Sequence, residues 1–159
     1  MSKAHGQNRT DRGYPAKLKG IVEADETYIG GKRRGQSRGR SGVESNKSPV
    51  VSLVERHGQV RAFPVDRVTS NNLREIMCGN IKPQAAIMTD DFKSYGFVGK
   101  HFASHDQINH SEGKYVRREK GNSIHTNTAE GFFSIVKRGV IGVYHHWSKK
   151  HLHRYLEHF

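Results

Sequence analysis

The chain of 159 residues contains a single cysteine, Cys78. One cysteine excludes an intrachain disulfide, and it excludes zinc ribbons and knuckles, which need paired cysteines. We expect Cys78 to serve in packing. The chain also has no apolar run near the roughly 20 residues of a transmembrane helix, and its opening segment has no signal-peptide core. These absences predict a cytoplasmic protein.

Acidic residues are scarce relative to basic ones. Lys and Arg number 27 against 15 Asp and Glu, which gives a formal net charge of +12. An excess of this size favours a polyanionic partner, and nucleic acid is the leading candidate. Two alternatives are a merely hydrated basic surface and, more weakly, an anionic membrane surface. A basic segment near the end of the chain also holds five histidines, for which phosphate contact is more plausible than metal binding: His145, His146, His151, His153 and His158.

The apolar patterns predict one α/β domain of ordinary size. Residues 1–19 are polar and aperiodic, as expected of a loose leader. The later patterns predict a strand at 20–30, a hairpin at 49–68, a helix at 70–81, a buried strand at 85–92, a short helix at 94–102, an edge strand at 103–111, and helices at 127–142 and 148–159.

Two glycine-containing basic segments are expected to form loops. Residues 30–48 hold five glycines and six basic residues, a composition typical of an exposed loop that binds phosphate. Residues 113–126 show no clear period and are expected to form a second basic loop. The candidate DNA-binding residues are Lys32, Arg33, Arg34, Arg38, Arg40, Lys137, Arg138, Lys149 and Lys150.

Asp25 is the first candidate for a metal-dependent site. Phosphoryl transfer on DNA typically uses two divalent ions about 3.5–4 Å apart, and Mg²⁺ prefers oxygen ligands. Asp25 lies within the first predicted strand, where side-chain alternation places it on one face with Glu23 and Thr27, and places Glu26 on the other.

Asp90 and Glu130 complete a candidate acidic set. Asp90 closes the apolar run AAIM toward the end of a predicted buried strand, and from there its side chain can reach a cleft beside the central strand. Glu130 shares a predicted helix face with Asn127, Ser134 and Lys137. Lys137 lies two turns from Glu130, roughly 10 Å along the helix axis, where it could bind a DNA phosphate beside the metals.

Each acidic residue also has a plain structural explanation. Asn127 followed three residues later by Glu130 resembles a helix capping box. Asp25 could end a hydrogen-bonded strand pair, and Asp90 could cap the turn that follows it. Only the combination of the three favours a metal site.

Three segments together resemble a known family. They are VEADETYIGGKRRG, MTDDFKSY and HTNTAEGFFSIVKRGVIGVYHHWSKKHLHRYLEHF, and they are similar to the catalytic domain of bacterial insertion-sequence DDE transposases of the ISXO type. The family motifs are D-E-T-Y-I-G-G, T-D, and N-T-x-E followed seven residues later by Lys. The resemblance implies a ribonuclease H-like fold with a mixed central sheet, three antiparallel strands followed by parallel strands, flanked by helices.

The resemblance also implies residue roles. Asp25, Asp90 and Glu130 correspond to the metal-binding triad, Lys137 to the trailing basic residue, and Asn127 is a secondary candidate. Asp91 stands where the family usually has Gly. The implied cofactor is Mg²⁺ or Mn²⁺. The implied partners are transposon terminal inverted repeats and target DNA, bound by a homo-oligomer in the nucleoid.

Two departures from the family shape the expected domain organisation. Relatives usually carry an N-terminal zinc ribbon or helix-turn-helix for end recognition, and they usually continue beyond the point where this sequence stops. We therefore expect a polar leader at 1–19 and a catalytic domain at 20–159, in a truncated copy. The alternatives to an active transposase are a non-catalytic DNA-binding remnant and a general ribonuclease H-like nuclease.

Overall fold

A computed structural model describes residues 16–30, 47–90, 92–108, 117–119, 122–124, 126–139 and 151–156. The elements within these ranges are β1 (Ile21–Ile29), β2 (Ser48–Glu55), β3 (Val60–Pro64), α1 (Ser70–Asn80), β4 (Ala86–Asp90), α2 (Lys93–Val98), the 3₁₀ turn η1 (Gly99–His101), β5 (Ser104–Ile108), β6 (Arg117–Glu119), β7 (Asn122–Ile124), α3 (Asn127–Gly139) and α4 (Leu152–Leu156).

A mixed sheet forms the centre of the described structure. Its five strands have the order β3-β2-β1-β4-β5. β1 pairs antiparallel with β2 and β2 with β3, whereas β4 runs parallel to β1 and β5 runs parallel to β4. This is the expected arrangement of antiparallel strands followed by parallel ones, and it is compatible with a ribonuclease H-like fold.

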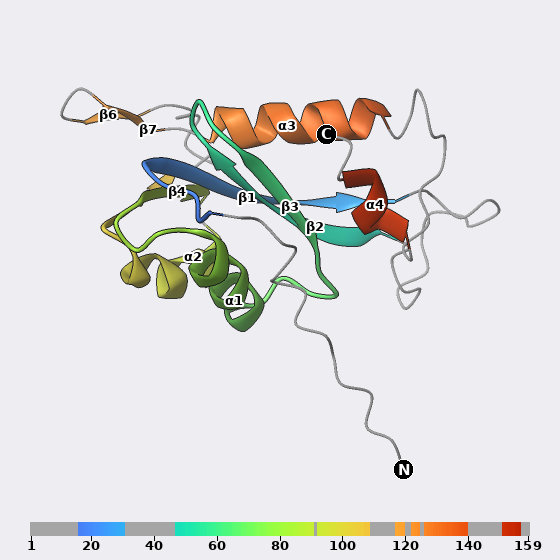
Figure 1. Cartoon of the computed structure of the whole chain (residues 1–159), viewed down its shortest axis with the longest axis horizontal. Coiled ribbons are helices and arrows are strands. Elements are labelled where there is room, and N and C mark those ends of the chain that lie inside the picture. The colour runs from blue at the N-terminus through green and yellow to red at the C-terminus, as the bar shows by residue number, and fades with distance from the viewer. Residues whose placement is uncertain are drawn as a thin grey trace, which may run out of the picture.

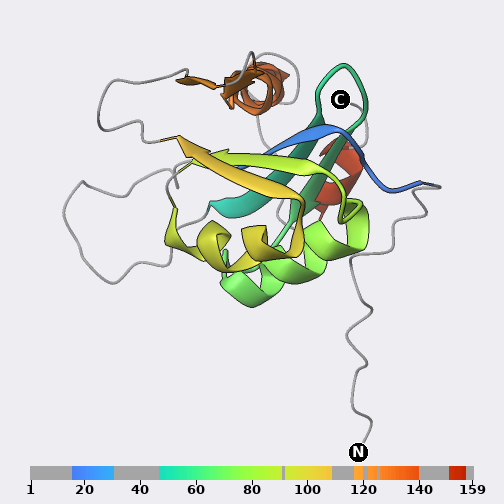
Figure 2. The same ribbon diagram turned by 90° about the vertical axis from the view of Figure 1, so that its left-hand side faces the viewer.

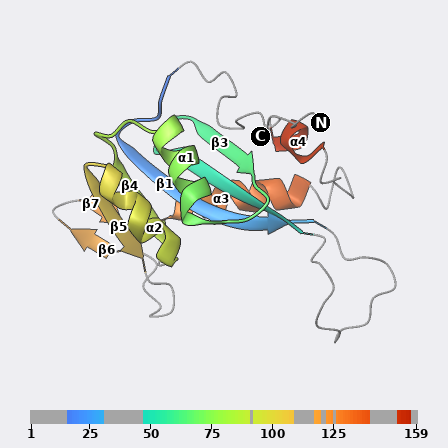
Figure 3. The ribbon, with the colours of Figure 1, turned by 90° about the horizontal axis from the view of Figure 1, so that it is seen from below.

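Helices cover both faces of the sheet. Helix α3 lies along one face, and α1 and α2 lie against the other (Figure 1; Figure 2). Seen from the side of α1 and α2, these two helices cross in front of the strands (Figure 3). Strand β1 is therefore central in the sheet and lies between two helical layers.

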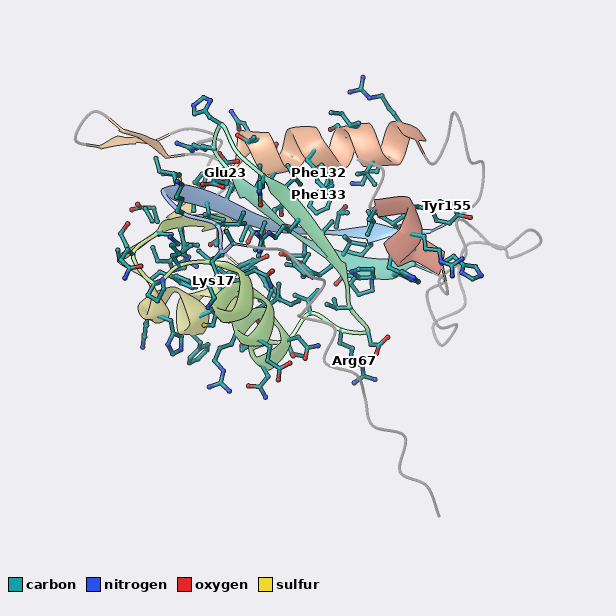
Figure 4. All side chains as sticks on the ribbon, in the orientation of Figure 1. Lys17, Glu23, Arg67, Phe132, Phe133 and Tyr155 are labelled. Atoms are coloured by element: carbon teal, nitrogen blue, oxygen red, sulfur yellow. The ribbon has the colours of Figure 1, made fainter. Side chains whose placement is uncertain are left out.

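Alternation along the strands divides the core into two main parts. Val22 and Ala24 of β1 face α1 and α2, whereas Ile29 faces α3 and α4. The part on the α3 side includes Phe132 and Phe133, which point from α3 toward the sheet (Figure 4). Because one face of β1 meets each layer, polar residues on this strand also reach one layer or the other.

The last residues of the expected leader pack against the domain. Leu18 is fully buried and forms a parallel bridge with Ile81. Buried Arg61 donates to the side chain of Asn80 at 3.0 Å and also to the backbone oxygen of Ala16. These contacts attach residues 16–18 to the end of α1, so this part of the segment is ordered by the core.

The second basic loop contains an element that the sequence pattern did not predict. Residues 117–119 and 122–124 form the antiparallel two-stranded ribbon β6–β7, where we expected a loop. The ribbon extends beyond the sheet on the side where α3 begins (Figure 1). Across the described ranges, no helix is long and apolar enough to cross a membrane.

Candidate functional site

The pairing of β1 with β4 brings the first two candidate residues level with each other. The parallel ladder runs from Ile21–Ala86 to Glu23–Met88. Continuing this register two residues further along both strands places Asp25 beside Asp90, at the carboxyl end of β4. Neighbouring side chains in a parallel register point to the same face. The sheet therefore brings together two of the residues that the sequence analysis selected as candidates.

A third carboxylate joins them from the other face of β1. Asp25, Glu26 and Asp90 each offer a ligand atom, and these atoms all lie within 4.8 Å of one another. Glu26 points toward α2, as alternation predicted, because the hydroxyl of Tyr95 donates to its Oε2 at 2.7 Å. The sequence did not identify Glu26 as a site residue. We call Asp25, Glu26 and Asp90 the acidic cluster.

Burial raises the pKa values of two members of the acidic cluster, Asp25 and Glu26. Desolvation is the largest cause at Asp25 and raises its pKa to about 7, assisted by the charges of Glu26, Asp90 and Glu130. Desolvation also raises the pKa of Glu26, although the hydrogen bond from Tyr95 opposes this change. Carboxylates held together in this way are stabilised in their ionised form by a cation. Their donors are all oxygens, the ligand type that Mg²⁺ and Mn²⁺ prefer.

The plain structural role considered for Asp90 is present, whereas Asp25 does not end the β1–β2 strand pair, which continues beyond it to Ile29. Asp90 Oδ1 accepts from the backbone amide of Phe92 at 3.1 Å, which is the turn cap considered from the sequence. Asp25 Oδ1 accepts from the amide of Glu26 at 2.8 Å. Each hydrogen bond occupies part of one carboxylate oxygen and restricts its rotation. These hydrogen bonds leave the other oxygen of each carboxylate able to accept a further ligand.

Glu130 approaches the acidic cluster from α3. It is exposed in the first turn of the helix, and its charge is one cause of the raised pKa of Asp25. Among the described residues, however, it is not in the set whose ligand atoms lie within 4.8 Å. The structure thus gives the third predicted residue an electrostatic effect on Asp25, whereas Glu26 belongs to the group whose ligand atoms lie within 4.8 Å of one another.

The capping box considered for Asn127 and Glu130 is not the arrangement that the structure contains. Asn127 is the first helical residue, and the amide of Glu130 donates to the carbonyl of Thr126 at 3.0 Å. The Glu130 side chain accepts from the Thr126 hydroxyl at 3.3 Å. Thr126 therefore occupies the position before the helix, and Asn127 does not.

The amides of the first turn of α3 are instead bound by Glu23 of β1. Glu23 Oε2 accepts from the amides of Thr128 at 2.8 Å and Ala129 at 3.1 Å, and its Oε1 accepts from the Thr128 hydroxyl at 2.9 Å. Arg56 forms a salt bridge with Glu23 Oε1 at 2.7 Å. Figure 4 shows Glu23 at the end of α3 where the helix begins. The sequence placed Glu23 on this face but gave it no partner.

The outer face of α3 carries the remaining candidates. Asn127, Glu130, Ser134 and Lys137, which the spacing placed on one helix face, are all exposed, and so is Arg138. Lys137 and Arg138 lie in the last turn, where cations interact favourably with the helix dipole. The helix thus presents an acidic group near its start and basic groups near its end.

Several predicted residues lie outside the described ranges. They are Asp91 and the loop and tail candidates Lys32, Arg33, Arg34, Arg38, Arg40, Lys149 and Lys150.

Comparison with known families agrees with this geometry. The model of the ISXO2-like transposase domain matches residues 17–159. The chain belongs to the ISXO2-like transposase family. Searches of the curated proteins and of the solved structures gave no significant match. Membership makes DNA the partner of this transposase domain and nucleotidyl transfer its kind of chemistry.

For an ISXO2-like transposase domain, the structure adds two residues to those that the sequence motifs indicated. Glu26 joins the acidic cluster, and Glu23 connects β1 to α3. Glu26 directly follows Asp25, the first motif aspartate, in the sequence, and this adjacency could have indicated Glu26 as a site residue. The partner of Glu23 is 105 residues away along the chain, and no local signal indicates it.

Proposed function

We propose that this transposase domain cleaves DNA at insertion-sequence ends and transfers the strands to target DNA, with Mg²⁺ or Mn²⁺ held by Asp25, Asp90 and Glu130. The catalytic unit is residues 20–159. The observation that carries the proposal is the convergence of carboxylates from β1 and β4 on one point, with the charge of Glu130 close enough to raise the pKa of Asp25.

The raised pKa of Asp25 supports a metal role more than a purely structural one. A carboxylate that only capped a turn or a strand would gain from hydrogen bonds, which lower its pKa. At Asp25, desolvation and three neighbouring carboxylates outweigh the backbone hydrogen bond. Such a site is unfavourable for negative charge until a cation enters it. Glu26 is a further ligand candidate on the same ground.

Each group of residues then has a distinct task. Bound divalent ions would activate the attacking oxygen and stabilise the leaving oxygen. The carboxylates fix the place of the ions, and the short contacts of Asp25 and Asp90 to backbone amides restrict their orientations. Lys137 and Arg138 on the outer face of α3 bind DNA phosphates as positive charges, and Asn127 is a secondary polar contact. Several copies act together on the paired ends.

The test measures strand cleavage of DNA that carries the ends of the element in Mg²⁺ or Mn²⁺. Asp25→Asn keeps the size of the side chain and an oxygen that accepts from the Glu26 amide, but removes the charge. We expect loss of at least about 100-fold in the cleavage rate, of the order that removal of one electrostatic group costs in an active site. Asp66→Asn, at an exposed position between β3 and α1, is the matched control.

The substrates separate the alternatives. Equal cleavage by the wild type and Asp25→Asn, or none by either with DNA binding intact, contradicts the proposed catalysis and favours a DNA-binding remnant. Equal cleavage of scrambled DNA or RNA–DNA hybrids contradicts end specificity and favours a general nuclease. Cleavage restricted to the element's ends, lost in Asp25→Asn and kept in Asp66→Asn, supports the proposal.

A further inference from the structure

Glu23 is the most completely buried acidic group described in the structure. Its side chain has 0% exposed surface, and its hydrogen bonds include three donors from α3 and one from Arg56, in the turn after β2. Burial of a carboxylate is unfavourable unless its oxygens are paired. Here a guanidinium, two helix amides and a hydroxyl supply the pairing, and the positive end of the helix dipole adds to it. This carboxylate is therefore built into the contact between β1 and α3.

The position of Glu23 joins two parts of the proposed metal site. It lies two residues before Asp25 on the same face of β1, and the last amide it binds belongs to Ala129, which directly precedes Glu130. One side chain thus connects the strand that carries the first acidic residue to the helical turn that carries the third.

Apolar packing alone would not fix the position of α3 relative to β1. Phe132, Phe133 and Val136 press α3 against the sheet. Such contacts are not directional, so they hold the helix against the sheet without fixing its position along its axis or its rotation. The hydrogen bonds of Glu23 are directional and lie at the end of the helix that carries Glu130.

Arg56 attaches this anchor to β4 as well. Its Nε donates to Glu23, and its Nη2 lies 2.9 Å from the sulfur of Met88, two residues before Asp90. The Glu23–Arg56 pair therefore contacts each of the three elements that supply the acidic residues: β1 itself, β4 and α3.

We infer that Glu23 is a positioning residue, which binds no metal and sets the place of Glu130 relative to Asp25. This inference rests on the proposed function, because it concerns the geometry of the same metal site. Residues that orient metal ligands typically contribute about 10- to 100-fold to metal affinity. Glu23→Ala is expected to weaken Mn²⁺ binding by that factor.

The test uses the whole chain and Mn²⁺ alone, with binding read from the rise of the unfolding temperature as Mn²⁺ is added. The wild type, Glu23→Ala, Asp25→Asn and Asn80→Ala are compared. Asn80 is the matched control because it is also buried and hydrogen-bonded, to Arg61 and Ile76, but lies on α1 across the sheet from α3. Asn80→Ala is expected to lower stability while changing the Mn²⁺ midpoint less than twofold.

A double variant shows whether Glu23 acts through Glu130. In a Glu130→Gln background, Glu23→Ala should weaken Mn²⁺ binding by less than twofold, because the residue it positions no longer carries charge. An undiminished effect in that background overturns the inference. So does a midpoint for Glu23→Ala that matches Asn80→Ala.

A milder variant keeps the test usable if Glu23→Ala does not fold. Thr128→Val removes one hydroxyl donor and leaves both helix amides in place. Loss of one hydrogen bond predicts a weakening of about two- to tenfold, and an unchanged midpoint then overturns the inference. The proposed function fails separately, if the wild type shows no Mn²⁺ response or Asp25→Asn keeps it in full.

Discussion

Replacing Asp25 by Asn is expected to stabilise the metal-free chain at pH 8 while abolishing its response to metal. The Asp25 carboxyl has its pKa raised from its ordinary value of 3.8 to about 7, chiefly by desolvation. Between those values the folded chain binds a proton that the unfolded chain has released. Its stability therefore falls as the pH rises through this window, and the full penalty is present above about pH 7. Asn is neutral at every pH and avoids the penalty.

The size of the expected gain in stability follows from the change in the pKa of Asp25. The rise from 3.8 to about 7 corresponds to about 4 kcal/mol at 1.36 kcal/mol per pKa unit. Because Asp25 keeps part of its surface in water, we take about half of this figure, ~2 kcal/mol at pH 8. For a domain of this size that amounts to ~4–8 °C in unfolding temperature. At pH 5 only about a third of the window has been crossed, so the gain should shrink to about a third.

Thermal unfolding followed by circular dichroism, in EDTA at pH 5 and pH 8, measures both values. Asp66 is an exposed carboxylate far along the chain from Asp25. Its replacement, Asp66→Asn, should change the unfolding temperature little at either pH. A second series with added Mn²⁺ should raise the unfolding temperature of the wild type and not that of Asp25→Asn. An Asn variant that is no more stable than the wild type in EDTA at pH 8 would refute the electrostatic reasoning.

Three further changes test other parts of the structure. Tyr95→Phe removes the hydroxyl that donates to Glu26. The free energy of unfolding at pH 8, measured by chemical denaturation, should fall by about 1.5 kcal/mol, the low end for a hydrogen bond to a charged group. No loss would mean that this hydrogen bond is not formed in solution. Gly131→Ala should raise stability by about 0.5–1 kcal/mol, since nothing lies within 4 Å of the added Cβ in this helix; destabilisation would show that the helix face is covered. Lys137→Ala should weaken DNA binding, and it should reduce the slope of log affinity against log salt concentration by about 1 when binding is measured by fluorescence anisotropy. An unchanged slope would show that Lys137 does not contact a DNA phosphate.

The part of the site that the sequence could predict follows from the alternation of side chains along β1. It placed Asp25 and Glu23 on one face of β1 and Glu26 on the other, and the contacts of Glu23 with α3 and of Glu26 with Tyr95 agree. It could not predict that Glu26 also approaches Asp90. That proximity arises where the β1–β4 ladder has ended at Glu23–Met88, beyond the last paired residues.

Long-range partners and short strands explain most of what the sequence did not predict. The capping box was inferred from the local spacing of Asn127 and Glu130, whereas the acceptor of the helix amides comes from β1. The ribbon β6–β7 has strands of three residues, too short for an alternating pattern to be recognised. The mixed sheet of antiparallel strands followed by parallel ones, by contrast, was implied by the family resemblance, and the hairpin of β2 and β3 followed from a pattern that is local along the chain.

The link between Glu23 and α3 has a consequence for synthesis of the protein. The ribosome synthesises the chain from its amino end, and a domain generally folds as a unit. A nascent chain that has reached β5 already contains every strand of the central sheet, but the donors from Thr128 and Ala129 that surround Glu23 have not yet been made. Glu130 follows in the same helical turn. The carboxylates of β1 and β4 are thus translated long before the helix that completes their surroundings, and an interrupted translation product would carry the sheet without an assembled site for DNA chemistry.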